Sequence, residues 1–411
     1  MVRRLIFLLF FCVCGNPICA DYAYVLNSFS NSVSVIDTAS NTVVATLSSG
    51  FSGPYEAVIT PNGKYVYVTN TSSNKVDVID TSNYAITASI TVLAGSYGVA
   101  ITPDGNYVYA VKTNSINVIE TSNNSVYATV TVSTGALGIA ITPNGEYAYL
   151  VNSSNNNVNV IEIANNSVVA TVPVGSGPNY VAITPDGQYA YVTNGGSTGV
   201  NGVSVIEVSN HTVVASITVG NKPLGIAINP NGKYAYVANS SDSPGDVSVI
   251  DIASNTVVAT VKVGSNPQGV AVTVDGAYAY VTNDNNPGNV SVIETANNTV
   301  VATVTVGENP GNVALPLYNP SPATNLTGEQ VKNSFGVRYE LYNVLDWDAS
   351  LSERATNYLV QRNGTTIETL SASSPLTFTD HNRPRNVTTT YSIIATDAFG
   401  NPSSSVSIQL P

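Results

Sequence analysis

From residue 22 to residue 317 the chain alternates small aliphatic residues with aromatic or polar ones in short runs, separated by Gly, Asn, Asp and Pro. A period of two indicates β-strands with one residue type on each face. One such run, Tyr189–Asn194, occurs seven times with small changes. The copies begin at Tyr22, Tyr65, Tyr107, Tyr147, Tyr189, Tyr234 and Tyr278. Their spacing of 40 to 45 residues is the length of a four-stranded blade and predicts a propeller of seven blades.

One complete repeat contains four predicted strands, which we name A (Leu224–Asn229), B (Tyr234–Asn239), C (Val247–Asp251) and D (Thr256–Val263). Most A–B turns read Pro-Asn-Gly or Pro-Asp-Gly, as at Pro230, Asn231 and Gly232. Proline presets the first turn position and glycine supplies the positive φ that ends the turn. The pattern therefore predicts antiparallel four-stranded blades joined by tight turns.

The order of the strands predicts how the ring closes. The repeats start with a B strand at Tyr22, and the last A strand is Asn312–Leu317, so one A strand is left over at the end. We expect this strand to complete the first blade, because an open ring would leave unpaired strand edges.

These repeats resemble the YVTN-type β-propeller repeat of bacterial and archaeal cell-surface proteins. The resemblance covers residues 22–317 and implies a propeller on an exported protein, while it says little about activity. The predicted fold class is all-β: a seven-bladed β-propeller over residues 21–318, closed by a C-terminal strand and followed by a β-sandwich.

After Pro316, Pro320 and Pro322 the repeat period ends and the composition changes, which predicts a second domain over residues 319–411. This part resembles a fibronectin type III-like sandwich, with Trp347 and Tyr391 as core aromatic residues. The segments that carry the resemblance are Tyr358–Gly364, Leu376–Asp380 and Tyr391–Gly400. The segment Leu326–Tyr342 is longer than the first two strands usual in that family.

Residues 1–20 read as a signal peptide: a positive start, Met1–Arg4, an apolar run, Leu5–Cys14, and small residues before a cleavage site near Ala20. We therefore expect a secreted, periplasmic or cell-surface protein. All three cysteines lie in this segment, so the mature chain would have no disulfide. No later run is apolar enough for a transmembrane segment. We also expect the protein to be a monomer.

The net charge is −12 at pH 7 and only 10% of the residues are charged, so no basic patch is available for phosphates. This excludes nucleic acid as an expected partner.

The histidines, His211 and His381, fall in different predicted domains. A metal cluster or a Ser-His-Asp triad would need more such groups at one place. His211 occupies the turn position that Asn255 has in the next repeat, and both residue types tolerate positive φ. A structural role in the turn is therefore the preferred interpretation of His211.

Asp242, Asp246 and Asp284 lie in B–C loops of adjacent blades and offer the oxygen ligands that calcium prefers. Their spacing matches no defined calcium loop, and Asp is common in exposed turns. We predict no metal and no cofactor, and a structural calcium stays an open alternative.

Each blade serves as a control for the others, so departures from the repeat mark candidate binding residues. Near the start of the A strands most blades have glycine: Gly98, Gly138, Gly225 and Gly269. Three blades have Glu56, Tyr180 and Asn312 instead, and the preceding residues are Tyr55, Tyr97, Leu137, Asn179, Leu224 and Gln268. These nine residues should surround one mouth of the central channel as a binding surface. The alternative is that Tyr55, Tyr97 and Tyr180 only fill gaps between blades.

The function we expect is an exported, non-enzymatic binding or adhesion protein that presents a propeller loop face to a protein or glycan. The alternatives are an enzyme similar to propeller lactonases or quinone-dependent dehydrogenases, in which Glu56 could serve, and a structural surface-coat component. Residues 21–319 contain no arginine and one histidine, which is too few for a convergent catalytic site and disfavours the enzyme.

Overall fold

The computed structural model describes residues 22–92, 95–196, 202–240, 244–316, 324–335, 338–348, 357–381, 387–396 and 406–410. The predicted signal segment lies outside these residues. Within the described part of the chain, no helix has the length and apolar character needed to cross a membrane.

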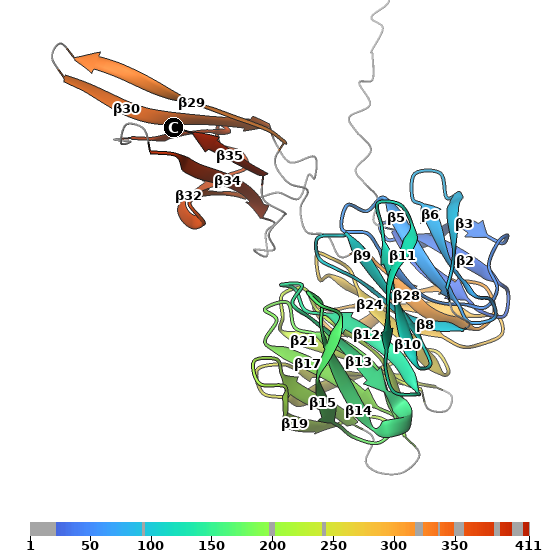
Figure 1. The fold of residues 1–411 in the computed structure, drawn as a ribbon. Helices are drawn as coiled ribbons and strands as arrows, with labels where there is room; N and C mark the ends of the chain where they lie inside the picture. The colour runs from blue at the N-terminus through green and yellow to red at the C-terminus, as the bar shows by residue number, and fades with distance from the viewer. Residues whose placement is uncertain are drawn as a thin grey trace, which may run out of the picture.

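Seven antiparallel four-stranded sheets form the blades of a propeller, as the repeat predicted (Figure 1). Blade one contains β28, β1, β2 and β3, and each later blade contains the next four strands in chain order. The innermost A strands are β4 (Pro54–Ile59), β8 (Ser96–Ile101), β12 (Ala136–Ile141), β16 (Pro178–Ile183), β20 (Pro223–Ile228), β24 (Pro267–Val272) and β28 (Pro310–Ala314). The B strands are β1 (Tyr22–Asn27), β5 (Tyr65–Asn70), β9 (Tyr107–Lys112), β13 (Tyr147–Asn152), β17 (Tyr189–Asn194), β21 (Tyr234–Asn239) and β25 (Tyr278–Asn283).

The outer half of each blade is a C–D hairpin. The C strands are β2 (Ser32–Asp37), β6 (Lys75–Asp80), β10 (Ser115–Glu120), β14 (Asn157–Glu162), β18 (Gly202–Glu207), β22 (Asp246–Asp251) and β26 (Asn289–Glu294). The D strands are β3 (Thr42–Leu47), β7 (Ile86–Thr91), β11 (Ser125–Thr131), β15 (Ser167–Pro173), β19 (Thr212–Thr218), β23 (Thr256–Lys262) and β27 (Thr299–Thr305). A short 3-10 turn, η1 (Ser153–Asn155), lies in the B–C loop of blade four.

The ring closes through pairing of the last A strand with the first B strand. In β28 and β1, Ala314 pairs with Tyr24, Val313 with Val25, and Pro310 with Asn27. The predicted scheme is confirmed, but the strand begins at Pro310, two residues before the expected Asn312, and ends at Ala314 rather than Leu317. The other A strands also begin earlier than the candidate binding residues. In blade two the strand begins at Pro54, one residue before Tyr55 and Glu56, because Pro54 still pairs with Asn70 at the end of the B strand.

Each B strand carries a buried tyrosine at its third position, and these seven side chains are at most 2% exposed: Tyr24, Tyr67, Tyr109, Tyr149, Tyr191, Tyr236 and Tyr280. The hydroxyl of Tyr191 donates to Asn255 Oδ1 at 2.7 Å, in the C–D turn of the next blade. Tyr67, Tyr109 and Tyr280 make the same bond with Asn124, Asn166 and Asn41. Aromatic burial and one hydrogen bond thus join successive blades.

His211 occupies the turn slot that the sequence assigned to it. Its φ is 56°, close to the 52° of Asn255, and its Nδ1 lies 2.8 Å from the Tyr149 hydroxyl. Burial lowers the pKa of His211, and the nearby Glu146 acts in the opposite direction. The histidine therefore joins blades four and five as the turn asparagines join other pairs.

The outer D strands contain a β-bulge in every blade. In blade one Ile36 pairs with Val43 and Val35 with Ala45, which leaves Val44 outside the pairing and 49% exposed. A bulge at a strand edge bends and twists the edge and hinders pairing with another chain. The repeat thus protects the otherwise open outer edge of each blade.

Residues beyond the propeller form two further sheets, drawn in orange and red in Figure 1. One contains β29 (Thr324–Phe335), β30 (Arg338–Asp348) and β33 (Thr377–Asp380). The other has the order β32 (Thr365–Ser371), β31 (Asn357–Arg362), β34 (Thr389–Thr396) and β35 (Val406–Leu410). Trp347 and Tyr391 are both buried in their shared core, as predicted. The long segment Leu326–Tyr342 belongs to β29 and β30, strands of 12 and 11 residues.

Candidate functional site

The nine predicted binding residues all lie on the inner strands, at a bulge that each of these strands contains. In blade two Pro54 pairs with Asn70 and Ala57 pairs with Val68, so Tyr55 and Glu56 together oppose Thr69. The other positions are equivalent, and all nine side chains are partly exposed: Tyr55, Glu56, Tyr97, Leu137, Asn179, Tyr180, Leu224, Gln268 and Asn312. The bulge frees these residues from regular pairing, so their side chains can differ without breaking the sheet.

The glycines at the second bulge position are required by close contact between inner strands. A Cβ atom at Gly98 would lie 2.2 Å from the carbonyl oxygen of Leu137, and one at Gly225 would lie 2.6 Å from that of Gln268. Side chains at these positions would collide with backbone of the next blade. At this position only three blades carry a side chain larger than glycine that can extend toward the centre of the ring: Glu56, Tyr180 and Asn312.

Tyrosines from three blades meet across the central axis. The Tyr180 hydroxyl of blade five donates to the Tyr55 hydroxyl of blade two at 3.3 Å. The rings of Tyr55 and Tyr97 lie edge to face, with centroids 5.6 Å apart. Burial raises the pKa of Tyr55 and Tyr180, and the nearby Glu56 raises both further, so the phenols stay protonated. Since blades two and five lie on opposite sides of the ring, this contact crosses the channel.

Glu56 lies beside these tyrosines and connects three blades. Its Oε1 accepts a hydrogen bond from Asn312 Nδ2 of blade one at 3.0 Å, and its Oε2 accepts one from the backbone N–H of Val99 of blade three at 3.3 Å. Part of the side-chain surface stays accessible, but the surrounding protein removes most of its hydration. This burial raises the pKa of Glu56 to about 8 and outweighs the Val99 bond, which lowers it. At neutral pH the carboxyl is mainly protonated.

The remaining predicted residues do not converge on Glu56. Asn179 Nδ2 donates to the carbonyl oxygens of Gly177 at 3.1 Å and Pro223 at 3.4 Å, and Gln268 Nε2 donates to Ser240 Oγ at 3.4 Å. Both amides thus hold the loops around the mouth. The backbone carbonyl of Leu224 in blade six accepts a hydrogen bond from Thr193 Oγ1 of β17 at 2.7 Å, which gives the threonine of this B strand a role in joining blades five and six.

Phe29 belongs to the same face and was missed by the sequence analysis. It lies in the B–C loop of blade one and its side chain is 74% exposed. The loop is held in place, because the Ser28 N–H donates to the Asn309 carbonyl at 3.0 Å and Ser30 Oγ accepts from the Glu308 N–H at 2.6 Å. The sequence contained a signal, since Phe29 is the one aromatic residue in the B–C loops.

The acidic loops provide little support for a metal site. Asp246 Oδ2 forms an ion pair with Lys262 Nζ at 2.9 Å, and burial raises the pKa of Asp284. Asp242 lies outside the described residues. Among the described residues, no group of three or more His, Cys, Asp or Glu side chains could hold a metal ion.

The family model for YNCE-like β-propellers matches residues 17–319. The chain belongs to the YNCE-like β-propeller family. This match agrees with the propeller seen in the structure, and the YVTN likeness stays a prediction. No curated protein matches the sequence.

Several solved structures share the fold. A functionally unknown protein from Desulfotomaculum acetoxidans DSM 771 has a TM-score of 0.64 at 21% identity, with 73% of this chain and 100% of that chain covered. A hydrazine synthase from Kuenenia stuttgartiensis has a TM-score of 0.60 at 21% identity, with coverages of 64% and 90%. The dihydro-heme d1 dehydrogenase NirN, in complex with DHE, has 0.56 at 14% identity, with coverages of 71% and 74%. At these identities the likeness concerns the fold alone.

Proposed function

We propose that this member of the YNCE-like family is an exported, non-enzymatic binding protein that takes a protein or glycan partner at the channel mouth and the B–C loop face. The observation that carries the proposal is the group of Tyr55, Tyr97 and Tyr180 around Glu56, in a ring where four of the seven blades have glycine. Aromatic rings beside a few convergent polar groups provide both the contact area and the orientation that binding needs.

The exposed Phe29 supports the same face as the contact surface. A large apolar side chain that is 74% exposed, on a loop tied to its neighbour, presents a fixed hydrophobic contact to a partner. Adhesion would follow if the partner lies on a cell surface and the second domain acts as a spacer. The order of its two sheets supports a fibronectin type III-like sandwich in that role.

An enzyme is the second candidate, and the specific observation in its favour is Glu56. A carboxyl whose pKa is about 8 can donate or accept a proton near neutral pH. Both of its oxygens already accept hydrogen bonds from Asn312 and Val99, however, and His211 lies on the C–D turn at the opposite face. Binding therefore accounts for more of the geometry than proton transfer does.

The proposal is tested in two steps. Glycan arrays and pull-downs from surface extracts identify a partner, and its affinity is then measured for folded Tyr97→Ala, Tyr180→Ala and Glu56→Gln variants. We expect each variant to bind at least about tenfold more weakly, the loss of about 1.4 kcal/mol. Val301→Ala, on the outer D strand of blade seven, is the matched control. Unchanged affinity in all three variants would place the binding site elsewhere. Conversion of a bound small molecule that Glu56→Gln abolishes would favour the enzyme.

A further inference from the structure

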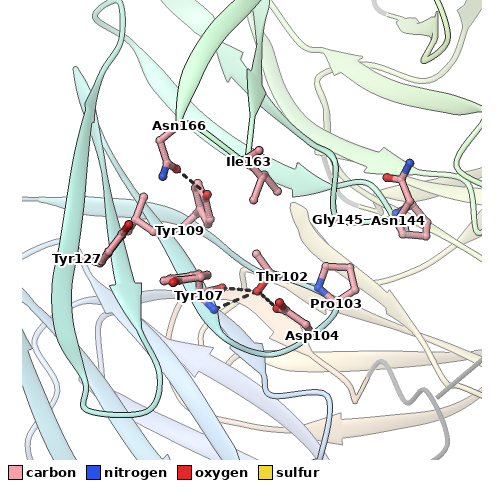
Figure 2. A pocket seen from close by; sticks show the side chains of 13 residues that line it. Thr102, Pro103, Asp104, Tyr107, Tyr109, Tyr127, Asn144, Gly145, Ile163 and Asn166 are labelled. Carbon is pink, nitrogen blue, oxygen red and sulfur yellow. Dashed lines mark hydrogen bonds between the residues drawn. The ribbon is translucent and has the colours of Figure 1, made fainter. Parts of the chain in front are cut away.

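A cleft of about 480 Å³ lies between blades three and four, on the face opposite the channel mouth. The A–B and C–D turns form this face, whereas the B–C loops and the connections between blades form the other. Figure 2 shows Tyr127, Tyr107 and Asp104 of blade three together with Asn144 and Asn166 of blade four around the space. The volume falls within the range of small-molecule sites, about 300–1,000 Å³.

Tyr127 is the residue that makes this junction different from the other six. It is the unpaired bulge residue of β11, between Val126, which pairs with Ile119, and Ala128, which pairs with Val118. The equivalent residues of the other blades are Val44, Thr87, Val169, Val214, Val258 and Val301. Tyr127 is 62% exposed, and its ring packs on that of Tyr107 with centroids 5.3 Å apart. Tyr107 also packs against the core of the blade, whereas Tyr127 lies outside that core, and together the two rings form an aromatic wall.

Polar groups of fixed orientation surround this wall. Asp104 Oδ1 accepts from Thr102 Oγ1 at 2.5 Å and from the Asn106 N–H at 3.0 Å. Burial alone would raise the pKa of Asp104, but these hydrogen bonds outweigh it and lower the pKa, so the carboxylate is ionised at neutral pH. Asn166 Oδ1 accepts from the Tyr109 hydroxyl at 2.7 Å, which orients the amide. Within the described residues, no hydrogen bond uses Asn166 Nδ2 or the hydroxyls of Tyr107 and Tyr127.

The next junction shows what this cleft lacks. Between blades four and five, His211 takes the place of Asn166 and its ring packs against Tyr147 with centroids 5.0 Å apart. The imidazole covers the tyrosine there and also bonds to Tyr149. At the cleft the corresponding Tyr107 packs against Tyr127 instead, and both rings border the open space.

We propose that this cleft binds one neutral hexopyranose ring of a glycan. A sugar ring has an apolar face of C–H bonds and a rim of hydroxyl groups. The C–H face fits the aromatic wall of Tyr127 and Tyr107, and the hydroxyls can donate to Asp104 and accept from Asn166 Nδ2. An acidic sugar is disfavoured, because the Asp104 carboxylate and the net charge of −12 would repel it. This site is independent of the channel mouth.

The test uses the full mature chain and a panel of neutral oligosaccharides: cellotriose, maltotriose, mannotriose, triacetylchitotriose and lactose. Saturation-transfer NMR identifies the sugars that bind, and calorimetry measures their affinity. We expect Tyr127→Val to weaken binding at least about tenfold, while Tyr127→Phe, which keeps the ring, retains most of the affinity. Because Val is the residue that most other blades carry at this position, the variant should fold. Asp104→Asn, which introduces the turn residue of blades two, four and six, should also weaken binding.

Val169→Ala changes the equivalent exposed position of blade four and should leave the affinity unaltered. The proposal is overturned if no sugar of the panel binds, if Tyr127→Val binds as well as the unmodified protein, or if Tyr127→Phe loses as much affinity as Tyr127→Val. Preferential binding of a uronic acid oligomer would contradict the predicted role of Asp104.

Discussion

Two sets of residues lie on adjacent strands of every blade: the buried tyrosines of the B strands and the bulge residues of the A strands. The first set is the same in all blades, whereas the second differs from blade to blade. All seven B strands have the same buried tyrosine, at most 2% exposed. At the second bulge position the blades, taken in order round the ring from blade two, have Glu, Gly, Gly, Tyr, Gly, Gly and Asn. Each tyrosine of the first set packs against the next blade. The second set makes contacts that occur once in the ring.

This difference separates residues that maintain the fold from residues that are candidates for function. The stability of a repeat protein depends on the free energy of the interface between each repeat and its neighbour. A contact that occurs at every junction between blades therefore contributes to stability at each of them. The Tyr180–Tyr55 and Glu56–Asn312 contacts have no equivalent at other junctions, so the repeat does not need them to form. The three predictions below test this separation.

The largest effect should come from removing the strand that closes the ring. A chain that ends at Asn309 lacks β28, whereas one that ends at Tyr318 keeps it and loses only the second domain. Without β28 the edge of β1 is exposed, and Val313 no longer packs between blades one and seven. Each lost ladder bond contributes about 1 kcal/mol, and the separated blades lose their packing as well.

We expect the chain ending at Asn309 to melt at a lower temperature and to associate as its concentration rises, because an unpaired edge recruits other chains. Differential scanning calorimetry and sedimentation velocity of the two truncations measure both effects. Equal melting temperatures and monomeric behaviour of both would mean that β28 does not hold the ring together.

A smaller but still large effect should follow from truncating one buried tyrosine. Tyr236 is fully buried between blades six and seven, and Tyr236→Ala should lower the free energy of unfolding by about 3–5 kcal/mol. Tyr180→Ala, at a partly exposed channel position, should cost less. Urea unfolding of both variants gives the comparison. If Tyr180→Ala proved the more destabilising, Tyr180 would be a residue that maintains the fold. The distinction between stabilising and functional residues would then be wrong.

Most of the fold could be predicted, because the same signal occurs seven times in the chain. The period-two pattern located the B strands, and the Tyr22 start indicated which strand would close the ring. The slot of His211 was also predictable from its alignment with Asn255. The start of β28 was placed too late, because Pro310 pairs with Asn27 although proline lacks the N–H donor of a regular strand residue.

The candidate site could be predicted only in part. The sequence identified which positions depart from the repeat, but not which side chains meet, since Tyr180 reaches a residue 125 positions away. Convergence depends on side-chain length and on the width of the ring, which no local pattern contains. Phe29 and Tyr127 were visible as departures, but they lie outside the A strands, and their exposure depends on the loop and bulge geometry.

The smallest predicted effect concerns the pH dependence of stability that Glu56 produces. Its pKa is raised to about 8 in the folded protein, above the ordinary 4.5, so the folded state holds the proton more tightly than the unfolded state does. The stabilisation that Glu56 contributes to the folded state is therefore fully present below about pH 4.5. It falls as the pH rises from 4.5 to about 8 and is smallest above about pH 8. Glu56→Gln keeps an uncharged side chain of the same size at every pH.

We expect the free energy of unfolding of Glu56→Gln, relative to the unmodified protein, to rise between pH 5 and pH 8.5 by about 1–3 kcal/mol. One unit of pKa corresponds to about 1.4 kcal/mol, and the accessible part of the side chain reduces the full value. Urea unfolding at several pH values measures this difference, and Glu308→Gln, an exposed glutamate on the same face, is the matched control. If the difference stays constant with pH, or does not exceed that of the control, the carboxyl is already ionised in the folded protein. The channel would then contain a fixed negative charge, and the partner would be expected to carry a positive group in place of a neutral one.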